Sequence, residues 1–165
     1  KGVKLHPEYQ GFYANDPKMK PIYRTISRLG LLVLFHAGHD YGFAPPYHGM
    51  PQHILEALAW LDTPVIAAHW GGVGCAQEVL DKLCGAPVWL DTSLCAVRRA
   101  KSAEWGALCG EILRRHDPAR ILFATDTPWS DPAAEIDFVR SLELSEEITD
   151  GILGGNARAL VDSCR

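Results

Sequence analysis

Five short apolar runs are spread along the chain, at residues 2–5, 31–35, 64–68, 87–90 and 121–124. Each run is bounded by glycine, proline or polar residues, which is typical of a β-strand. The runs are apolar almost throughout instead of alternating between apolar and polar positions. That pattern indicates a parallel sheet whose two faces are both buried. The sequence therefore predicts five buried parallel strands.

Segments with helical spacing separate the five runs. They cover residues 17–29, 51–61, 75–83, 98–115 and 132–142, and two shorter pieces follow at 145–153 and 156–162. Asp16 and Asp131 each precede a proline and are expected to cap a helix, as are Ser145 and Asn156. Gly30 is expected to end the first of these helices. Strict alternation of strands and helices predicts an α/β fold in a single domain.

A polar or ionisable side chain follows each predicted strand. These residues are His6, His36, His69, Asp91 and Asp126. The carboxyl ends of parallel strands meet at one edge of a sheet or barrel, so the five side chains are expected to converge. A single histidine at a strand end is usually structural, but so many ionisable groups at one edge need pairing or a metal. Imidazole and carboxylate groups bind Zn²⁺ and similar ions, so we expect a metal-dependent site.

Six motifs in this sequence resemble the amidohydrolase-2 family. They are Gly2-Val3-Lys4-Leu5-His6-Pro7, Phe35-His36-Ala37-Gly38, Ala68-His69-Trp70-Gly71-Gly72, Leu90-Asp91-Thr92-Ser93, Phe123-Ala124-Thr125-Asp126-Thr127-Pro128-Trp129 and Ile152-Leu153-Gly154-Gly155-Asn156-Ala157. The resemblance covers essentially the whole sequence. It implies a TIM (β/α)₈-type barrel of the amidohydrolase superfamily, of which this chain would hold the last five βα units, strands 4 to 8.

The resemblance also implies roles for individual residues. His36 matches the metal ligand after the fifth barrel strand, His69 the catalytic or metal-binding histidine after the sixth, and Asp126 the aspartate after the eighth, which binds metal and transfers a proton. The expected cofactor is a divalent metal ion, with zinc as the first expectation. Other side chains at or beside the strand ends are candidates for substrate binding, namely Lys4, His6, His39, Trp70, Asp91 and Trp129.

The loop at residues 38–50 is rich in aromatic and polar side chains, and we expect it to line or cover the pocket. The family resemblance makes a hydrolase the first functional hypothesis, acting on a C–N or ester bond of a small molecule through metal-activated water. Non-oxidative decarboxylation of a small aromatic or unsaturated acid is an alternative that the strand-end residues leave open. A third alternative is an inactive barrel fragment that binds no metal.

Two departures from the family pattern bear on completeness. The H-x-H pair of the family's first strand occurs nowhere in the 165 residues. A complete barrel of this type needs about 250 residues. We therefore expect residues 1–165 to be one partial barrel domain of a larger enzyme. Because its sheet would have open edges and an apolar inner face, formation of a homo-oligomer is also an expectation.

Composition narrows the expected partners. There are 16 Lys and Arg residues against 20 Asp and Glu residues, with no basic cluster, so nucleic acid is not an expected partner. No apolar run approaches the length of a membrane span and no secretory pattern opens the sequence, so we expect no membrane partner and a cytoplasmic location. The five cysteines are scattered, without a C-x-x-C pair, and are expected to be reduced and mostly buried.

Overall fold

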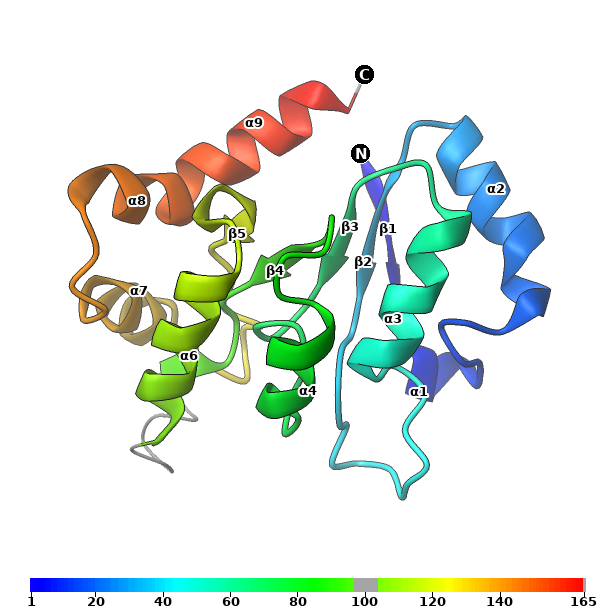
Figure 1. The fold of residues 1–165 in the computed structure, drawn as a ribbon, viewed down its shortest axis with the longest axis horizontal. Helices are drawn as coiled ribbons and strands as arrows, with labels where there is room; N and C mark the ends of the chain where they lie inside the picture. The colour runs from blue at the N-terminus through cyan, green and yellow to red at the C-terminus, as the bar shows by residue number, and fades with distance from the viewer. Residues whose placement is uncertain (97–103, 165) are drawn as a thin grey trace.

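The computed structural model describes residues 1–96 and 104–164. At its centre is a sheet of five parallel strands in the order β1-β2-β3-β4-β5 (Figure 1). The strands are β1 (Gly2–Leu5), β2 (Leu32–Phe35), β3 (Val65–Ala67), β4 (Trp89–Asp91) and β5 (Ile121–Leu122). Each strand pairs with the next one along the chain, and every pair is parallel. The predicted strands and their parallel arrangement are confirmed.

The last strand is shorter than predicted. Strand β5 ends at Leu122, whereas the apolar run continues to Ala124. The Phe123 amide donates to the carbonyl of Ile152 at 2.9 Å. The Ala124 amide donates to the Thr92 hydroxyl at 3.1 Å instead of continuing the β4 ladder. These two contacts divert the chain from the sheet before it reaches Asp126.

Helices lie between successive strands and also follow the last strand. They are α1 (Pro7–Gln10), α2 (Lys20–Arg28), α3 (Pro51–Ala57), α4 (Ala76–Lys82), α6 (Glu104–Arg115), α7 (Pro132–Arg140), α8 (Glu146–Asp150) and α9 (Asn156–Ser163). Short 3₁₀ turns occupy η1 (Pro17–Met19), η2 (Leu58–Trp60) and η3 (Pro118–Arg120), and η4 (Gly151–Gly155) is π-helical. The predicted helices are confirmed where the structure describes them; residues 98–103 of the predicted helix 98–115 lie outside the described residues.

Most of the predicted helix caps are confirmed. The Asp16 carboxylate accepts from the Lys18 amide, the Asp131 carboxylate from two amides of α7, and the Ser145 hydroxyl from the Ile148 amide. Gly30 follows α2 with a positive φ of 63°. The prediction for Asn156 was wrong, because its side-chain amide donates to the carbonyls of Pro118 and Ile121 and so ties α9 to β5.

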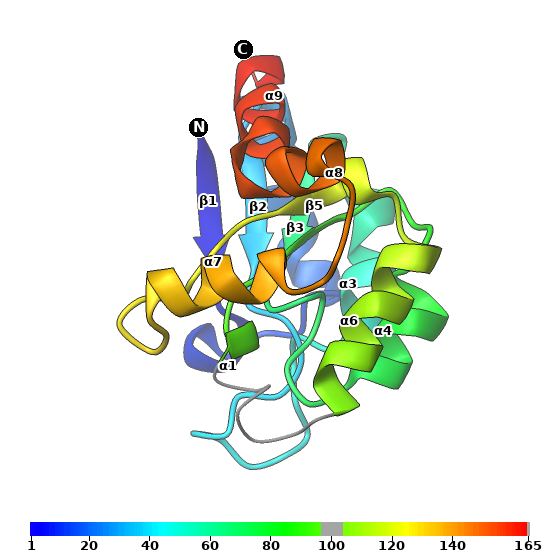
Figure 2. The ribbon, with the colours of Figure 1, turned by 90° about the vertical axis from the view of Figure 1, so that its left-hand side faces the viewer.

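The two faces of the sheet pack differently. One face carries buried side chains such as Val33, Phe35, Val65 and Leu90, which belong to the main hydrophobic core. Helices α3, α4 and α6 lie on that side of the sheet (Figure 2). Residues at alternate strand positions point to the opposite face, as the pleat of a strand requires. The main core therefore lies between the sheet and these helices.

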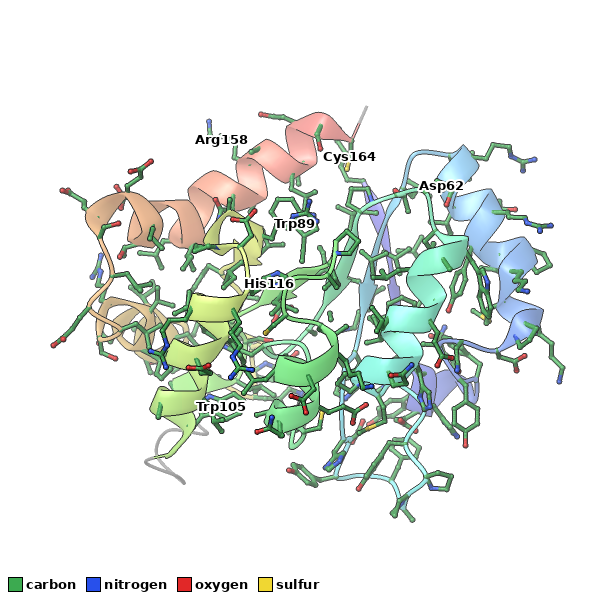
Figure 3. The ribbon with its side chains drawn as sticks, viewed as in Figure 1. Asp62, Trp89, Trp105, His116, Arg158 and Cys164 are labelled. Atoms are coloured by element: carbon green, nitrogen blue, oxygen red, sulfur yellow. The ribbon has the colours of Figure 1, made fainter. Side chains whose placement is uncertain are left out.

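Helix α9 covers part of the opposite face of the sheet. Leu160 of α9 packs in a second cluster with Ile66 and Leu122, against which Leu34 and the partly buried Trp89 also pack (Figure 3). The helix lies near the amino ends of the strands, where both chain ends are found (Figure 1). Its contacts leave the carboxyl edge of the sheet to the connecting loops.

Two expectations from composition can be compared with the structure. All five cysteines are free; Cys95, Cys109 and Cys164 are buried, and the other two are half-buried. Among residues 1–96 and 104–164, no helix has the length and apolar character needed to cross a membrane. The expectation of mostly buried thiols is thus confirmed.

Candidate active site

Three histidines meet at the carboxyl edge of the sheet. His6 follows β1 and His36 follows β2, and because these strands pair in parallel the two rings stack with centroids 4.2 Å apart. His69 follows β3, and its Nε2 lies 3.2 Å from Nδ1 of His36. His36 and His69 are both buried. The parallel register thus brings together three residues that lie far apart in the sequence.

His69 is held by the end of β4 and the segment that follows it. Its Nδ1 lies 2.7 Å from the Ser93 hydroxyl, which donates to Oδ1 of Asp91 at 2.5 Å. The same carboxylate oxygen accepts from the backbone amide of His69 at 2.9 Å. Asp91 therefore orients both the backbone of His69 and, through Ser93, its ring. This is the arrangement by which a buried carboxylate fixes the orientation and tautomer of a functional imidazole.

Asp40, in the loop after β2, faces the histidines from the other side. Its Oδ2 lies 3.4 Å from Nε2 of His6. Donor atoms of His6, His36 and Asp40 all lie within 4.8 Å of one another. Two imidazoles and a carboxylate at this spacing fit a divalent metal ion after small side-chain movements.

The electrostatics of the site favour neutral imidazoles. Burial, helped by the charges of His69, His6 and Lys4, lowers the pKa of His36 to about 3, against the opposing charge of Asp40. Burial also lowers the pKa of His6, while the neighbouring Asp40 opposes this change. Neutral imidazole is the form that binds a metal or accepts a proton. Both histidines are therefore available as ligands or bases near neutral pH.

Lys4 and Asp126 lie at the same edge. Much of the Lys4 residue is exposed, yet desolvation around its ammonium group lowers its pKa, and the charges of Asp91 and Asp126 oppose that effect. Partial desolvation raises the pKa of Asp126. The positive charge of Lys4 opposes this increase, and the negative charge of Asp91 adds to it. Burial raises the pKa of Asp91, against its hydrogen bonds to Ser93 and His69. With Asp40, the site thus combines a lysine and three carboxylates with three histidines.

The backbone is strained where the site is built. His69, Trp70 and Asp126 have positive φ values of 60°, 56° and 58°. Side chains other than glycine adopt this left-handed conformation at an energetic cost, and such positions gather at functional sites. After β3 and after β5, a residue with this strained backbone is one that the sequence predicts to be catalytic, His69 and Asp126 respectively.

The two tryptophans that are predicted to bind substrate lie in opposite environments. Trp70 is fully buried, and its indole nitrogen donates to the carbonyl of Thr92 at 3.2 Å. Trp70 thus packs within this chain, and its contact with substrate stays a prediction. Trp129 is 75% exposed on the loop after β5. Its ring is therefore accessible at the surface beside Asp126.

The loop at residues 38–50 closes over the histidines. His39 is half-buried; its carbonyl oxygen lies 3.4 Å from Nε2 of His36, and its ring stacks on Tyr47 at 4.4 Å. The buried carboxylate of Glu8 fastens the far end of the loop, because it accepts from the His48 amide at 2.5 Å and pairs with the His48 ring at 2.9 Å. The loop thus lines the site, as predicted.

Two buried carboxylates that support the site escaped the sequence analysis. Glu8 fastens the loop just described, and Glu135 of α7 is fully buried. The Glu135 carboxylate accepts from the amides of Cys95 and Ala96 and from the Ser130 hydroxyl. It therefore ties the segment after β4 to the segment after β5. Neither glutamate follows a strand, so strand-end position gave no signal for them.

Comparison with known families identifies the class of protein. The sequence matches the amidohydrolase family model Amidohydro_2 over residues 1–162, so the chain belongs to this family, and the predicted resemblance is confirmed. No curated protein sequence matches it significantly.

Solved structures with the same fold are distant in sequence. An uncharacterised TIM-barrel protein from Bordetella bronchiseptica has a TM-score of 0.72 at 21% identity, over 93% of this chain and 53% of that protein. A proposed 2-pyrone-4,6-dicarboxylic acid hydrolase from Pseudomonas putida gives 0.71 at 18% identity, over 98% and 63%. A dihydroxybenzoic acid decarboxylase from Polaromonas, with bound manganese and an inhibitor, gives 0.66 at 17% identity, over 93% and 56%.

These matches establish the architecture. The five parallel βα units of this chain have the TIM-barrel fold, as predicted. The chain spans 53% to 63% of the lengths of these three proteins.

Proposed function

We propose that this chain forms the strand 4 to 8 part of a metal-dependent enzyme that hydrolyses a C–N or ester bond of a small molecule. The observation that carries the proposal is the contact of His36 with His69, within hydrogen-bond distance of each other at the carboxyl edge of the sheet. Membership of the amidohydrolase family supports the same activity. A divalent metal, when bound, would supply Lewis acidity that lowers the pKa of water and polarises a carbonyl group.

The residues of this chain have distinct roles in the proposal. His36 holds the metal, with Asp126 as a further ligand implied by the family resemblance. His69, oriented by Ser93 and Asp91, accepts and returns the proton at its Nε2. Asp126 is the second acid-base group, and its raised pKa suits a carboxyl that exchanges a proton. Zinc is the metal we propose first; manganese, found in the Polaromonas decarboxylase, is the second.

Non-oxidative decarboxylation of a small aromatic or unsaturated acid is the second candidate. Lys4 is the observation that favours it, because an ammonium group at the same edge as the histidines can hold a substrate carboxylate. A hydrolase for a carboxylated ester would use the same lysine. The two candidates therefore differ in the bond that breaks and share the site.

A paired assay tests the proposal. The full-length protein that contains this sequence would be stripped of metal, reloaded with Zn²⁺ or Mn²⁺, and supplied with two panels of compounds. Esters, lactones and amides are followed by acid release, and aromatic carboxylic acids by CO₂ release. We expect metal-dependent turnover in the first panel and a loss of about 10²-fold or more in His69→Asn, with Asp62→Asn as an unaffected control. CO₂ release alone would identify the decarboxylase, and no metal-dependent turnover in either panel would contradict both candidates.

A further inference from the structure

Asp40 joins the metal candidates to an exposed part of the loop at residues 38–50. One carboxylate oxygen, Oδ1, accepts from the Gly42 amide at 2.9 Å, and the Asp40 carbonyl accepts from the Phe43 amide at 3.0 Å. The other oxygen, Oδ2, faces Nε2 of His6 at 3.4 Å. A single side chain therefore shapes the turn and points toward the histidines.

The two ends of this loop are fixed without Asp40. At its start, the His39 amide donates to the carbonyl of Val73 at 2.8 Å, and at its end Gly49 accepts from the Gly38 amide at 2.9 Å. Residues 41–46 between these ends are exposed. Besides Asp40, the edge-on contact of Phe43 with Tyr9, at 4.9 Å between ring centroids, holds this tip. The Asp40 carboxylate is thus in a position to control the tip.

We propose that His6, His36 and Asp40 together bind the divalent metal, and that the metal thereby fastens the loop tip over the site. Two imidazoles and one carboxylate suit zinc, manganese or iron better than calcium or magnesium, which prefer oxygen ligands. The inference rests on the proposed function for the presence of a metal, but it assigns two ligands, His6 and Asp40, outside the set implied by the family. A loop that supplies a ligand is ordered when the ion binds.

The Nε2 atom of His6 supports this assignment. Nε2 of His6 meets only a carboxylate oxygen at a distance longer than a good hydrogen bond. A cation between these groups would be attracted by the carboxylate and accept the imidazole lone pair.

The test measures metal binding and loop protection, and needs no substrate. The full-length protein is stripped of metal and titrated with Co²⁺ and Zn²⁺, while hydrogen exchange is followed in peptides that cover residues 40–47. We expect saturating metal to slow exchange in these peptides. Asp40→Asn keeps an oxygen for the Gly42 amide but loses the charged ligand, so it should weaken metal binding by about tenfold or more and abolish the added protection. Asp62→Asn, in an exposed loop, is the matched control.

The outcomes separate this inference from the proposed function. Wild-type metal affinity and wild-type protection in Asp40→Asn would overturn the ligand assignment while leaving a metal-dependent enzyme intact. Full metal binding without any turnover would contradict the proposed function instead. A His6→Asn variant gives a second reading, since the loop keeps its own hydrogen bonds there and should still lose metal-dependent protection.

Discussion

The Ser93 hydroxyl lies 2.7 Å from Nδ1 of His69 and 2.5 Å from Oδ1 of Asp91. A hydroxyl has one proton, and the Ser93 hydroxyl donates it in the hydrogen bond to the Asp91 carboxylate. The Ser93 oxygen therefore accepts a hydrogen bond from the protonated Nδ1 of His69. The neutral His69 ring then presents an unprotonated Nε2 toward His36. Asp91 at the end of β4 and Ser93 just after it thus set which nitrogen of His69 can accept a proton.

Replacement of Ser93 by alanine is expected to destabilise the protein by about 1–3 kcal/mol, because it removes the hydrogen bonds of the hydroxyl with the buried His69 ring and the buried Asp91 carboxylate. Ser93→Thr, which keeps the hydroxyl, should retain more of the stability. Urea unfolding measures both effects. Ser163→Ala, at an exposed serine of α9, should change the free energy of unfolding by less than about 0.5 kcal/mol. Equal stability of Ser93→Ala and the wild type would contradict the hydrogen-bond chain described here.

His116 is expected to make the protein sensitive to acid. It is buried after α6 (labelled in Figure 3), its Nδ1 accepts from the Gly85 amide at 3.2 Å, and burial lowers its pKa while the Val88 carbonyl opposes this change. The unfolded chain binds this proton near the ordinary pKa of about 6.5, before the folded state does. The contribution to stability is therefore complete above about pH 6.5 and is lost as the pH falls toward the lowered folded-state pKa.

The measurement compares the free energy of unfolding at several pH values below neutrality. His116→Gln should show a weaker decline with falling pH than the wild type. Because His36, with its pKa of about 3, contributes in the same direction, the difference between variant and wild type is the informative quantity. Parallel slopes for wild type and His116→Gln would show that His116 does not cause the sensitivity.

The pattern of apolar runs was sufficient to predict the strands and most helices, since burial on both faces of a parallel sheet leaves a strong signal. Helix α1 was missed because four residues carry too little periodicity. Asn156 was misassigned because an asparagine at the start of a helix can bind distant backbone carbonyls instead of capping the helix. Here its side chain donates to the carbonyls of Pro118 and Ile121. Such long-range hydrogen bonds leave no local pattern.

The candidate site was also predictable only in part. Strand ends converge by topology, so the meeting of His6, His36 and His69 followed from their positions alone. The contributions of Asp40 and Glu135 depend on how loops and a distant helix fold back onto the edge, which spacing does not encode. Ser93 was recognisable only as a neighbour of Asp91, and its contact with His69 required the three-dimensional arrangement.

Gly38 is expected to tolerate no side chain. Its φ is 82°, and a Cβ atom there would lie 2.3 Å from the amide nitrogen of Val73 and 2.4 Å from its carbonyl oxygen. Gly38→Ala should therefore cost about 2–4 kcal/mol, from the left-handed backbone and the clash together. Gly11→Ala is the control, because its φ of 68° is similar but no atom lies within 4 Å of the added group. Thermal unfolding should show a clearly larger loss for Gly38→Ala, and equal losses would mean that the clash is relieved at no cost.

Leu160 tests whether α9 is an integral part of the fold. Its side chain is 3% exposed and packs with Ile66 and Leu122 on the sheet face away from the main core. Leu160→Ala removes buried methyl groups and leaves a cavity, so we expect a loss of about 2–5 kcal/mol. The neighbouring Val161 is 39% exposed, and Val161→Ala should change stability by less than about 0.5 kcal/mol. If both variants unfold at the same urea concentration as the wild type, the packing of α9 on this face of the sheet does not contribute to the stability of the protein.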